Sequence, residues 1–305
     1  IVDVLIIGCG PAGLTLAAQL SIFPEISVKI IDRKPGPLEL GQADGIACRS
    51  IEMFEAFGFS EKVLKEGYWV NEVAFWRPHD DGTGLYRADR IQDVEDDLSE
   101  MPHIILNQAR VHDFYLEVMR NGPQRLEPDY NRALVSLTRS DSEDYPCTAT
   151  FDCRDAEGQT EVIHAKYVVG CDGARSVVRK SLGHSLKGES ARQLWGVMDV
   201  LAVTDFPDIR LKGAIQSADA GSMLIIPREG GYMVRMYIEL DELTGDERAA
   251  DRNVTSDMLV DKARAILAPY VLDVKEVAWW SAYESGQRVC DTFDDAETND
   301  APRIF

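Results

Sequence analysis

The spacing of apolar residues changes twice near the start of the chain. Residues 4–7 and 28–31 are short uninterrupted apolar runs, and residues 12–23 between them carry apolar side chains at helical spacing. A strand, a helix and a second strand in this order are typical of a βαβ unit. We therefore expect residues 2–34 to open a Rossmann-like parallel sheet.

Smaller elements are predicted in the segment that follows. An amphipathic helix is expected at 50–57, closed by Gly58, and the alternation at 72–76 indicates a strand. Residues 85–100 are polar and are expected to be irregular, with the acids of 93–100 solvated in a loop. Apolar residues at helical spacing predict a helix over 108–119.

Strands dominate the rest of the chain. Runs at 134–137, 148–153 and 162–169 predict a small antiparallel meander. Further strands are expected at 196–203, 213–216, 222–226, 232–240 and 274–283. An amphipathic helix is expected at 255–269, with Thr255 or Ser256 as its N-cap.

These elements together predict a mixed α/β (α+β) fold. A Rossmann-like nucleotide-binding domain would be interleaved with a second domain built on a large antiparallel sheet. Ligand pockets are common where two such domains meet.

Net charge and cysteine usage exclude several classes of protein. The chain has 52 acidic and 32 basic residues, for a formal charge of −20, which argues against binding to nucleic acid or to anionic membrane surfaces. None of the six cysteines forms a C-x-x-C pair, so neither a zinc site nor a redox dithiol is indicated. This cysteine usage indicates a reducing compartment, so we expect a cytoplasmic protein. No apolar run reaches membrane-spanning length and no signal peptide is visible.

A G-x-G-x-x-G turn joins the first apolar run to its helix. Gly8 allows the tight turn, Gly10 lets the backbone approach a pyrophosphate, and Gly13 lets the helix pack closely on the strand. Asp32 ends the second apolar run, where it can accept hydrogen bonds from a ribose diol. Because the strand, the helix and the acid accompany the glycines, a dinucleotide site is favoured over a turn without a ligand.

A second strand-to-acid segment lies at residues 167–179. The apolar run there ends in Gly170-Cys171-Asp172-Gly173 and continues into a basic helix start. Asp172 could face a ligand at the carboxyl end of the strand, or it could cap the helix that carries Val177 and Val178. The segment alone leaves both interpretations open.

The two segments together resemble the flavoprotein aromatic hydroxylases, which are single-component FAD monooxygenases. The resemblance covers nearly the whole chain and points to the phenol hydroxylase branch of that family. Further stretches that carry it lie at 39–49, 104–112, 195–199 and 225–231.

The resemblance implies FAD as cofactor, NADPH or NADH as co-substrate, and a small aromatic substrate together with O₂. In this family a flavin hydroperoxide hydroxylates the ring, and a phenolate-like substrate reacts better than a phenol. The expected reaction is hydroxylation of a phenolic aromatic acid, with 3-hydroxybenzoate converted to 3,4-dihydroxybenzoate. Members often form dimers, so a homodimer is one expected state.

Five residues near the substrate are implied by the same resemblance. Asp44 is expected beside the phenolic hydroxyl, together with Tyr237. Arg235 shares a strand face with Tyr237 and could stabilise the phenolate or contact the flavin. Lys212 and His103 are expected to hold the substrate carboxylate, which needs a cationic partner when it is buried.

Cofactor contacts are implied for Arg49, Gln108 and Asp172, and Arg33 could reach the adenosine side after Asp32. We expect an FAD-binding domain at residues 1–69 and 104–190 and a substrate domain at 70–103 and 191–300. Residues 301–305 would begin a strand that returns to the first domain.

The chain departs from the family pattern at its end. Members continue into a second glycine-aspartate motif that contacts the flavin, and into further C-terminal segments. The sequence therefore suggests a piece of a longer enzyme. The alternatives are a phenol 2-monooxygenase, a salicylate-type hydroxylase, or an inactive truncated fragment that still binds flavin.

Overall fold

The computed structural model describes residues 1–41, 43–140, 144–156, 158–240, 253–296 and 301–305, and for residues 190–192 the backbone only. Gln42, part of one stretch that carries the family resemblance, lies outside the described residues. The chain forms two compact units. Unit 1 comprises Ile1–Ala43, Asn107–Lys187 and Arg288–Phe305, and unit 2 comprises Asp44–Leu106 and Gly188–Gln287. Residues 44–69, which we expected in the FAD-binding domain, thus pack with unit 2. Which residue ranges bind FAD and which bind the substrate stays a prediction.

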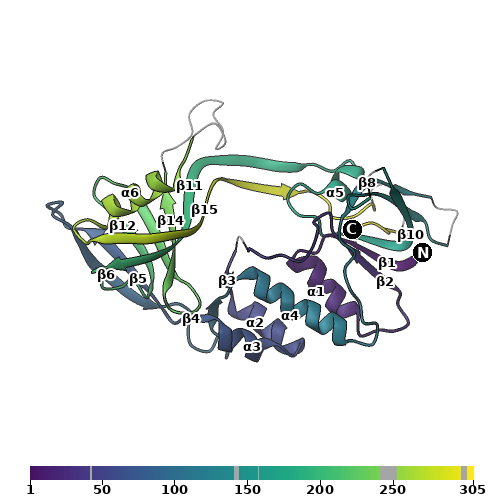
Figure 1. Ribbon diagram of the computed structural model, residues 1–305, viewed down its shortest axis with the longest axis horizontal. Helices are drawn as coiled ribbons and strands as arrows, with labels where there is room; N and C mark the ends of the chain where they lie inside the picture. Colours follow the sequence, from purple (N-terminus) through teal and green to yellow (C-terminus); the bar gives the residue numbers. More distant parts are fainter. Residues whose placement is uncertain (42, 141–143, 157, 241–252, 297–300) are drawn as a thin grey trace. The chain divides into compact units, whose positions relative to one another are not determined.

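Unit 1 is built on a five-stranded sheet that begins with the predicted βαβ unit (Figure 1). The strand order is β2-β1-β10-β9-β8, and β1 runs parallel to both of its neighbours. The predicted antiparallel meander of β8, β9 and β10 is confirmed. The strands are β1 (Val2–Ile7), β2 (Val28–Ile31), β8 (Arg132–Arg139), β9 (Cys147–Cys153) and β10 (Thr160–Gly170).

The helices of unit 1 begin as their sequences suggest. Helix α1 (Pro11–Leu20) has Pro11 in its first turn, and its N-cap is Gly10, whose lack of a side chain leaves the first amides uncapped. Helix α4 (Gln108–Asn121) packs against α1 and is capped by the side chain of Asn107. The short helix α5 (Val177–Ser181) follows the strand-to-acid segment.

Unit 2 contains a seven-stranded sheet with the order β15-β11-β14-β13-β12-β5-β6. Neighbours from β11 to β12 are antiparallel, as are β5 and β6, but β12 runs parallel to β5. The strands are β5 (Glu72–Pro78), β6 (Leu85–Gln92), β11 (Leu186–Thr204), β12 (Lys212–Gln216), β13 (Ser222–Pro227), β14 (Met233–Glu239) and β15 (Leu272–Cys290).

The expectation of irregular structure over 85–100 was wrong in its first half. Residues 85–92 form β6, an edge strand that pairs with β5 along its length. Every side chain of β6 after Leu85 is exposed, so the strand carries no apolar alternation. It is held by backbone hydrogen bonds to β5 and by Arg87, whose Nε donates to the buried Asp208 at 2.6 Å. A polar edge strand of this kind leaves little periodic signal.

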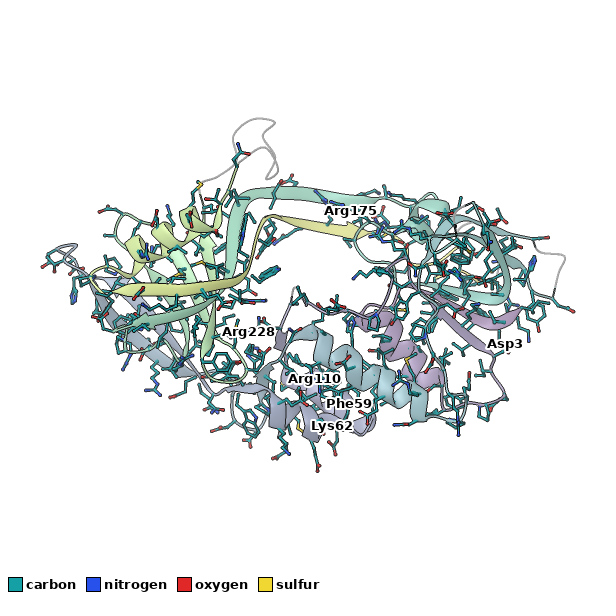
Figure 2. All side chains as sticks on the ribbon, in the orientation of Figure 1. Asp3, Phe59, Lys62, Arg110, Arg175 and Arg228 are labelled. Carbon is teal, nitrogen blue, oxygen red and sulfur yellow. The ribbon has the colours of Figure 1, made fainter. Side chains whose placement is uncertain are left out.

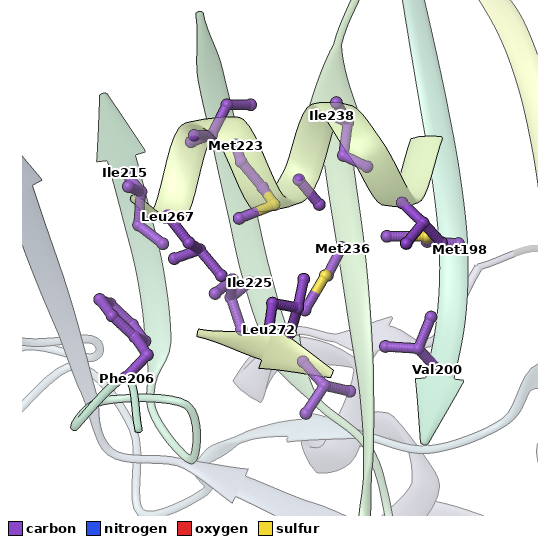
Figure 3. Packing of buried hydrophobic residues seen from close by; sticks show 14 of the residues in the cluster. Met198, Val200, Phe206, Ile215, Met223, Ile225, Met236, Ile238, Leu267 and Leu272 are labelled. Atoms are coloured by element: carbon purple, nitrogen blue, oxygen red, sulfur yellow. The ribbon is translucent and has the colours of Figure 1, made fainter. Parts of the chain in front are cut away.

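Helix α6 (Ser256–Leu267) covers one face of the seven-stranded sheet (Figure 1). Thr255 is its N-cap and accepts a hydrogen bond from the amide of Met258. Figure 3 shows the apolar core between helix and strands, in which side chains such as Met198, Ile225 and Met236 are fully buried. The opposite face of these strands is therefore free to carry polar chemistry.

A small three-stranded sheet completes unit 2. Its order is β3-β7-β4, with β3 (Gly45–Ile46), β7 (His103–Ile105) and β4 (Tyr68–Val70). Helices α2 (Cys48–Ala56) and α3 (Ser60–Glu66) connect β3 to β4. This sheet places Gly45 opposite Ile105, which brings the chain after Asp44 beside His103. Among the described helices, none has the length and apolar character needed to cross a bilayer.

Candidate functional site

Three of the predicted substrate residues project from one face of the seven-stranded sheet. On β14, Met236 and Ile238 enter the core beneath α6, so Arg235 and Tyr237 point to the opposite face. Tyr237 lies opposite Leu224 of β13, which in turn lies opposite Ala214 of β12. Lys212 precedes Ala214 by two residues and therefore shares its face. Strand β13 lies between β12 and β14, so the backbone of Lys212 is about 10 Å from the strand that carries Arg235 and Tyr237.

Asp44 lies at a buried cluster of charges on this face. Its side chain is almost fully buried, as is that of Arg235. Oδ2 of Asp44 is 3.1 Å from Nη1 of Arg235 and 3.0 Å from Nη1 of Arg228, which is labelled in Figure 2. Within the part of the chain that the structure describes, no group makes a hydrogen bond to this oxygen. The structure thus brings Asp44 and Arg235 together as an ion pair with incomplete hydrogen bonding.

A second buried acid, Asp199 of β11, takes up most of the guanidinium donors. Its Oδ1 accepts a hydrogen bond from Nε of Arg235 at 2.7 Å, and its Oδ2 accepts from Nη2 of Arg235 at 2.7 Å and from Nη1 of Arg228 at 2.8 Å. The Arg235 guanidinium also lies 5.1 Å from the ring centre of Trp279. A third acid, Glu229, accepts hydrogen bonds from Nε of Arg228 at 3.0 Å and from Nη2 at 2.9 Å, and its side chain is partly exposed. Two buried arginines therefore face three acids, of which Asp44 and Asp199 are buried.

The electrostatics of the cluster favour a proton acceptor at Asp44. Burial raises the pKa of the Asp44 carboxyl above its ordinary value, although the guanidinium groups of Arg235 and Arg228 act in the opposite direction. Burial also raises the pKa of Tyr237, and the negative charge of Asp44 adds to this effect. The cluster can hold an ionised carboxylate of increased basicity beside a neutral phenol side chain.

Lys212 and His103 meet through an acid that we did not predict as a site residue. Oδ1 of Asp93 lies 2.6 Å from Nζ of Lys212, and Oδ2 lies 2.7 Å from Nδ1 of His103. The Asp93 side chain is only 8% exposed. The expectation that the acidic run from Asp93 is a solvated loop is therefore wrong at its first residue, because the carboxylate is buried in an ion pair with Lys212 and in contact with the His103 ring.

The sequence offered only weak signals for the residues that we missed. Asp199 is a charged residue on the otherwise apolar strand 197–201, and Arg228 follows the apolar run 223–227. An isolated charge in such a run can indicate a buried pair. Asp93 has no such signal, because it stands beside other acids.

A pocket of about 490 Å³ in unit 1 contains most of the predicted nucleotide residues. Gly8 adopts a φ of +112°, and a Cβ there would lie 2.3 Å from the carbonyl oxygen of Cys171. A Cβ at Gly13 would lie 1.9 Å from the carbonyl oxygen of Gly8, whereas one at Gly10 would meet nothing within 4 Å. Close packing thus requires glycine at positions 8 and 13, whereas at Gly10 the space that a side chain would occupy is empty. The pocket is lined by Gly8, Gly10, Asp32, Arg33, Arg132, Arg154, Asp172 and Arg175, among others, and Arg175 is labelled in Figure 2.

Both predicted acids of unit 1 bind backbone amides. Asp32 accepts from the amide of Cys9 at 2.7 Å and from that of Lys34 at 2.8 Å. Oδ2 of Asp172 accepts from the amides of Val177 at 2.6 Å and Val178 at 3.3 Å in the first turn of α5, whose N-cap is Ser176. Oδ1 of Asp172 is buried and has no hydrogen-bond partner among the described residues. The contacts with the helix amides therefore use one carboxylate oxygen of Asp172 and leave the hydrogen-bonding capacity of the other unused among the described residues.

The remaining predicted cofactor residues lie in different places. Arg33 is exposed at the rim of the pocket. Gln108 is the first residue of α4 and packs so closely that a Cβ at Gly41 would be 2.5 Å from its own Cβ. Arg49 belongs to α2 of unit 2, where its side chain is 91% exposed and lies 3.5 Å from Glu52.

Comparison with known proteins places these features in context. A family model described as "FAD binding domain" matches residues 1–297. The chain is 58% identical over 314 aligned residues to 3-hydroxybenzoate 4-monooxygenase of Comamonas testosteroni, with 100% of this chain and 49% of that protein covered. It is 45% identical to the FAD-dependent monooxygenase terD of Aspergillus terreus, with 96% of this chain and 47% of that protein covered. The chain thus spans about half the length of these curated relatives.

Solved structures share the fold at lower identity. The p-nitrophenol 4-monooxygenase PnpA of Pseudomonas putida DLL-E4 has a TM-score of 0.76 at 18% identity, with 100% of this chain and 71% of that chain covered. The flavin-dependent monooxygenase PieE has a TM-score of 0.77 at 20% identity, with 100% and 52% covered. The predicted α/β fold class is confirmed by these likenesses.

Proposed function

Because the chain belongs to the FAD binding domain family, we propose that it is the flavin-binding and ring-binding part of a monooxygenase that hydroxylates a phenolic aromatic acid. The proposed reaction converts 3-hydroxybenzoate to 3,4-dihydroxybenzoate with NADPH or NADH and O₂ as co-substrates. The observation that carries the proposal is the buried Asp44–Arg235 pair, which shares a sheet face with Tyr237 and Lys212.

The residues of unit 1 fit FAD. Gly10 has open space where any Cβ would stand, and the first amides of α1 carry no side-chain cap, so a pyrophosphate can approach them. The orphaned Oδ1 of Asp172 and the guanidinium groups of Arg33 and Arg175 complete a polar pocket of suitable chemistry. When bound and reduced, FAD supplies the activated oxygen that is transferred to the ring.

Asp44 is proposed to accept the phenolic proton. A buried carboxylate of raised pKa is a better base than an exposed one, and it lies beside a guanidinium that can stabilise the negative charge of a phenolate. Tyr237 can donate or accept a hydrogen bond at the same ring oxygen, since it shares the face of Arg235. These groups together would increase the electron density of the ring.

Lys212 and His103 are proposed to bind the carboxylate of the ring. A carboxylate placed in a half-buried site requires a cation or a strong donor, because the uncompensated loss of water is costly. Lys212 starts two strands from Arg235, a separation suited to a single aromatic ring between two long side chains.

A second candidate function is hydroxylation of an uncharged phenol. It is favoured by Asp93, which already forms an ion pair with Lys212 and contacts the ring of His103. A phenol 2-monooxygenase would need no carboxylate site, whereas a salicylate-type hydroxylase would place the carboxylate next to the hydroxyl.

The test is NADPH and NADH oxidation by the FAD-loaded protein with 3-hydroxybenzoate, 4-hydroxybenzoate, salicylate and phenol, with the products identified by mass spectrometry. We expect 3-hydroxybenzoate to stimulate oxidation and to give 3,4-dihydroxybenzoate. Stimulation by phenol alone would support the second candidate. Retention of FAD without stimulation by any ring would contradict a catalytic role for this chain.

A further inference from the structure

Asp93 is held rigidly between the two proposed carboxylate-binding residues. It directly follows β6, and its amide donates a hydrogen bond to the carbonyl oxygen of Asn71 at 2.9 Å. Lys212 is the first residue of β12, and His103 is the first residue of β7. Three paired segments therefore fix the acid and both of its partners.

The charges of this group are largely shielded from water. The side chains of Asp93, His103 and Lys212 are 8%, 19% and 23% exposed. Burial raises the pKa of Asp93, but hydrogen bonds from Lys212 and His103 outweigh burial, so the net pKa lies below its ordinary value. Asp93 is thus an anion at neutral pH, and one carboxylate is shared by both partners.

The group is adjacent to the proposed proton acceptor. A Cβ built on Gly45 would lie 3.5 Å from Nε2 of His103, so the ring of His103 faces the residue that follows Asp44. Gly45 also pairs with Ile105 across β3 and β7. A ligand that reaches Asp44 with its hydroxyl group is therefore close to these charges.

We propose that Asp93 is the resting counter-ion of Lys212, held in place by its contact with His103, and that it determines how strongly the site prefers carboxylated rings over uncharged phenols. This inference rests on the proposed function. Without a ligand, Asp93 prevents Lys212 from standing as an unpaired buried cation, so a neutral ring can bind without that penalty. A carboxylated ring must share Lys212 and His103 with Asp93 and is repelled by the charge of Asp93.

The variant Asp93→Asn tests this directly because it removes the charge and keeps the shape. Binding of 3-hydroxybenzoate and of its uncharged isostere 3-hydroxybenzamide is measured by calorimetry on the FAD-loaded protein. We expect the variant to bind 3-hydroxybenzoate about tenfold more tightly, since a like charge at close range is lost. The affinity for 3-hydroxybenzamide should change by less than about twofold.

Two further variants separate charge from folding. Glu95→Gln removes an exposed acid two residues away and should leave both affinities unchanged. In a Lys212→Met background, Asp93→Asn should lose its selective effect, because the shared cation is absent. Thermal unfolding of each variant identifies any loss of folded protein.

The outcomes distinguish the inference from the proposed function. If the parent protein binds neither ring, the proposed function fails and this inference falls with it. If the parent binds 3-hydroxybenzoate but Asp93→Asn weakens that binding, or changes both affinities equally, only the counter-ion role is overturned. Selective tightening for the carboxylated ring, abolished by Lys212→Met, supports it.

Discussion

Asp199 binds Arg235 through both carboxylate oxygens, with distances of 2.7 Å to Nε and 2.7 Å to Nη2. The third guanidinium nitrogen, Nη1, lies 3.1 Å from Oδ2 of Asp44. Asp199 therefore fixes the orientation of Arg235 and occupies two of its three guanidinium nitrogens, which weakens the interaction of Arg235 with Asp44. Arg235 thus makes two short hydrogen bonds to Asp199 and a longer contact with Asp44, and Asp44 is the proposed base.

Replacing Asp199 by Asn should change both the basicity of Asp44 and the stability of unit 2. Asp199 contributes to the raised pKa of Asp44, so its loss should lower that pKa and move the acidic limb of the kcat/KM profile to lower pH. Asp199 accepts three hydrogen bonds from the buried arginines, whereas Oδ2 of Asp44 accepts none from the described residues, and weakening the bonds to Asp199 should cost about 3 kcal/mol of unfolding free energy in a urea titration. The exposed Asp219→Asn variant serves as control, and an unmoved pH profile would contradict the assigned role.

Replacing Asp44 by Asn should reduce kcat by about 10²–10⁴-fold, because the proton acceptor is lost, while ring binding is largely retained. The same change should stabilise the protein at pH 7. The folded-state pKa of Asp44 lies above its unfolded value, so the ionised group disfavours folding above the folded pKa. We expect a gain of about 1 kcal/mol that shrinks as the pH falls toward the unfolded pKa, measured by denaturant unfolding across pH. A loss of stability at pH 7 would show that the arginine contacts outweigh burial.

Two glycine variants should separate folding from FAD binding. Gly10→Ala adds a Cβ in open space, so thermal unfolding of the cofactor-free protein should be unchanged, while the affinity for FAD falls by about tenfold or more. Gly8→Ala must instead adopt a φ of +112° with its Cβ 2.3 Å from a backbone oxygen, so it should destabilise the protein itself. Equal FAD affinity in Gly10→Ala and the parent would contradict the proposed pyrophosphate site.

Asp295 should make unit 1 sensitive to acid. Its buried carboxylate accepts from Arg139 at 2.7 Å and from the amide of Arg303 at 2.8 Å. Burial raises the pKa of Asp295, but these hydrogen bonds outweigh burial and the net pKa is lowered. The stabilisation is present above the unfolded pKa and disappears as the pH falls through the folded one.

We therefore expect Asp295→Asn to lower the unfolding free energy at pH 7 by about 2 kcal/mol, with a difference that closes below pH 3.8. The exposed pair of Asp291 and Lys187 provides a control, since Asp291→Asn should cost less than about 1 kcal/mol. A gap between Asp295→Asn and the parent that persists in acid would contradict the ionic explanation.

Local patterns were sufficient to predict the βαβ opening, the meander and helix α6. In each case the apolar spacing matches one period over many residues, and Gly8, Gly13 or Thr255 marks the boundary. The edge strand β6 could not be predicted in this way, because its exposed side chains carry no alternation. Its formation depends on a partner strand, which a local window does not contain.

The same distinction between local pattern and long-range pairing holds for the candidate site. Asp44 and Arg235 were predicted and lie together, whereas Asp199 was not, because it meets Arg235 only through the register of β11 and β14. Asp93 likewise contacts Lys212 from a distant part of the chain. Pairings between residues far apart in sequence depend on strand order, and charge patterns alone do not encode that order. The roles of these residues in substrate and cofactor binding stay predictions.

The parallel pairing of β5 with β12 has a consequence for folding during translation. The two strands are separated by about 130 residues, most of which belong to unit 1. A ribosome that adds about 5–20 residues per second needs on the order of 10 s to make β12 after β5 has been made. The sheet of unit 1 is complete once β10 has been made, whereas the edge of β5 that pairs with β12 stays open throughout that interval and offers a template for association with another chain.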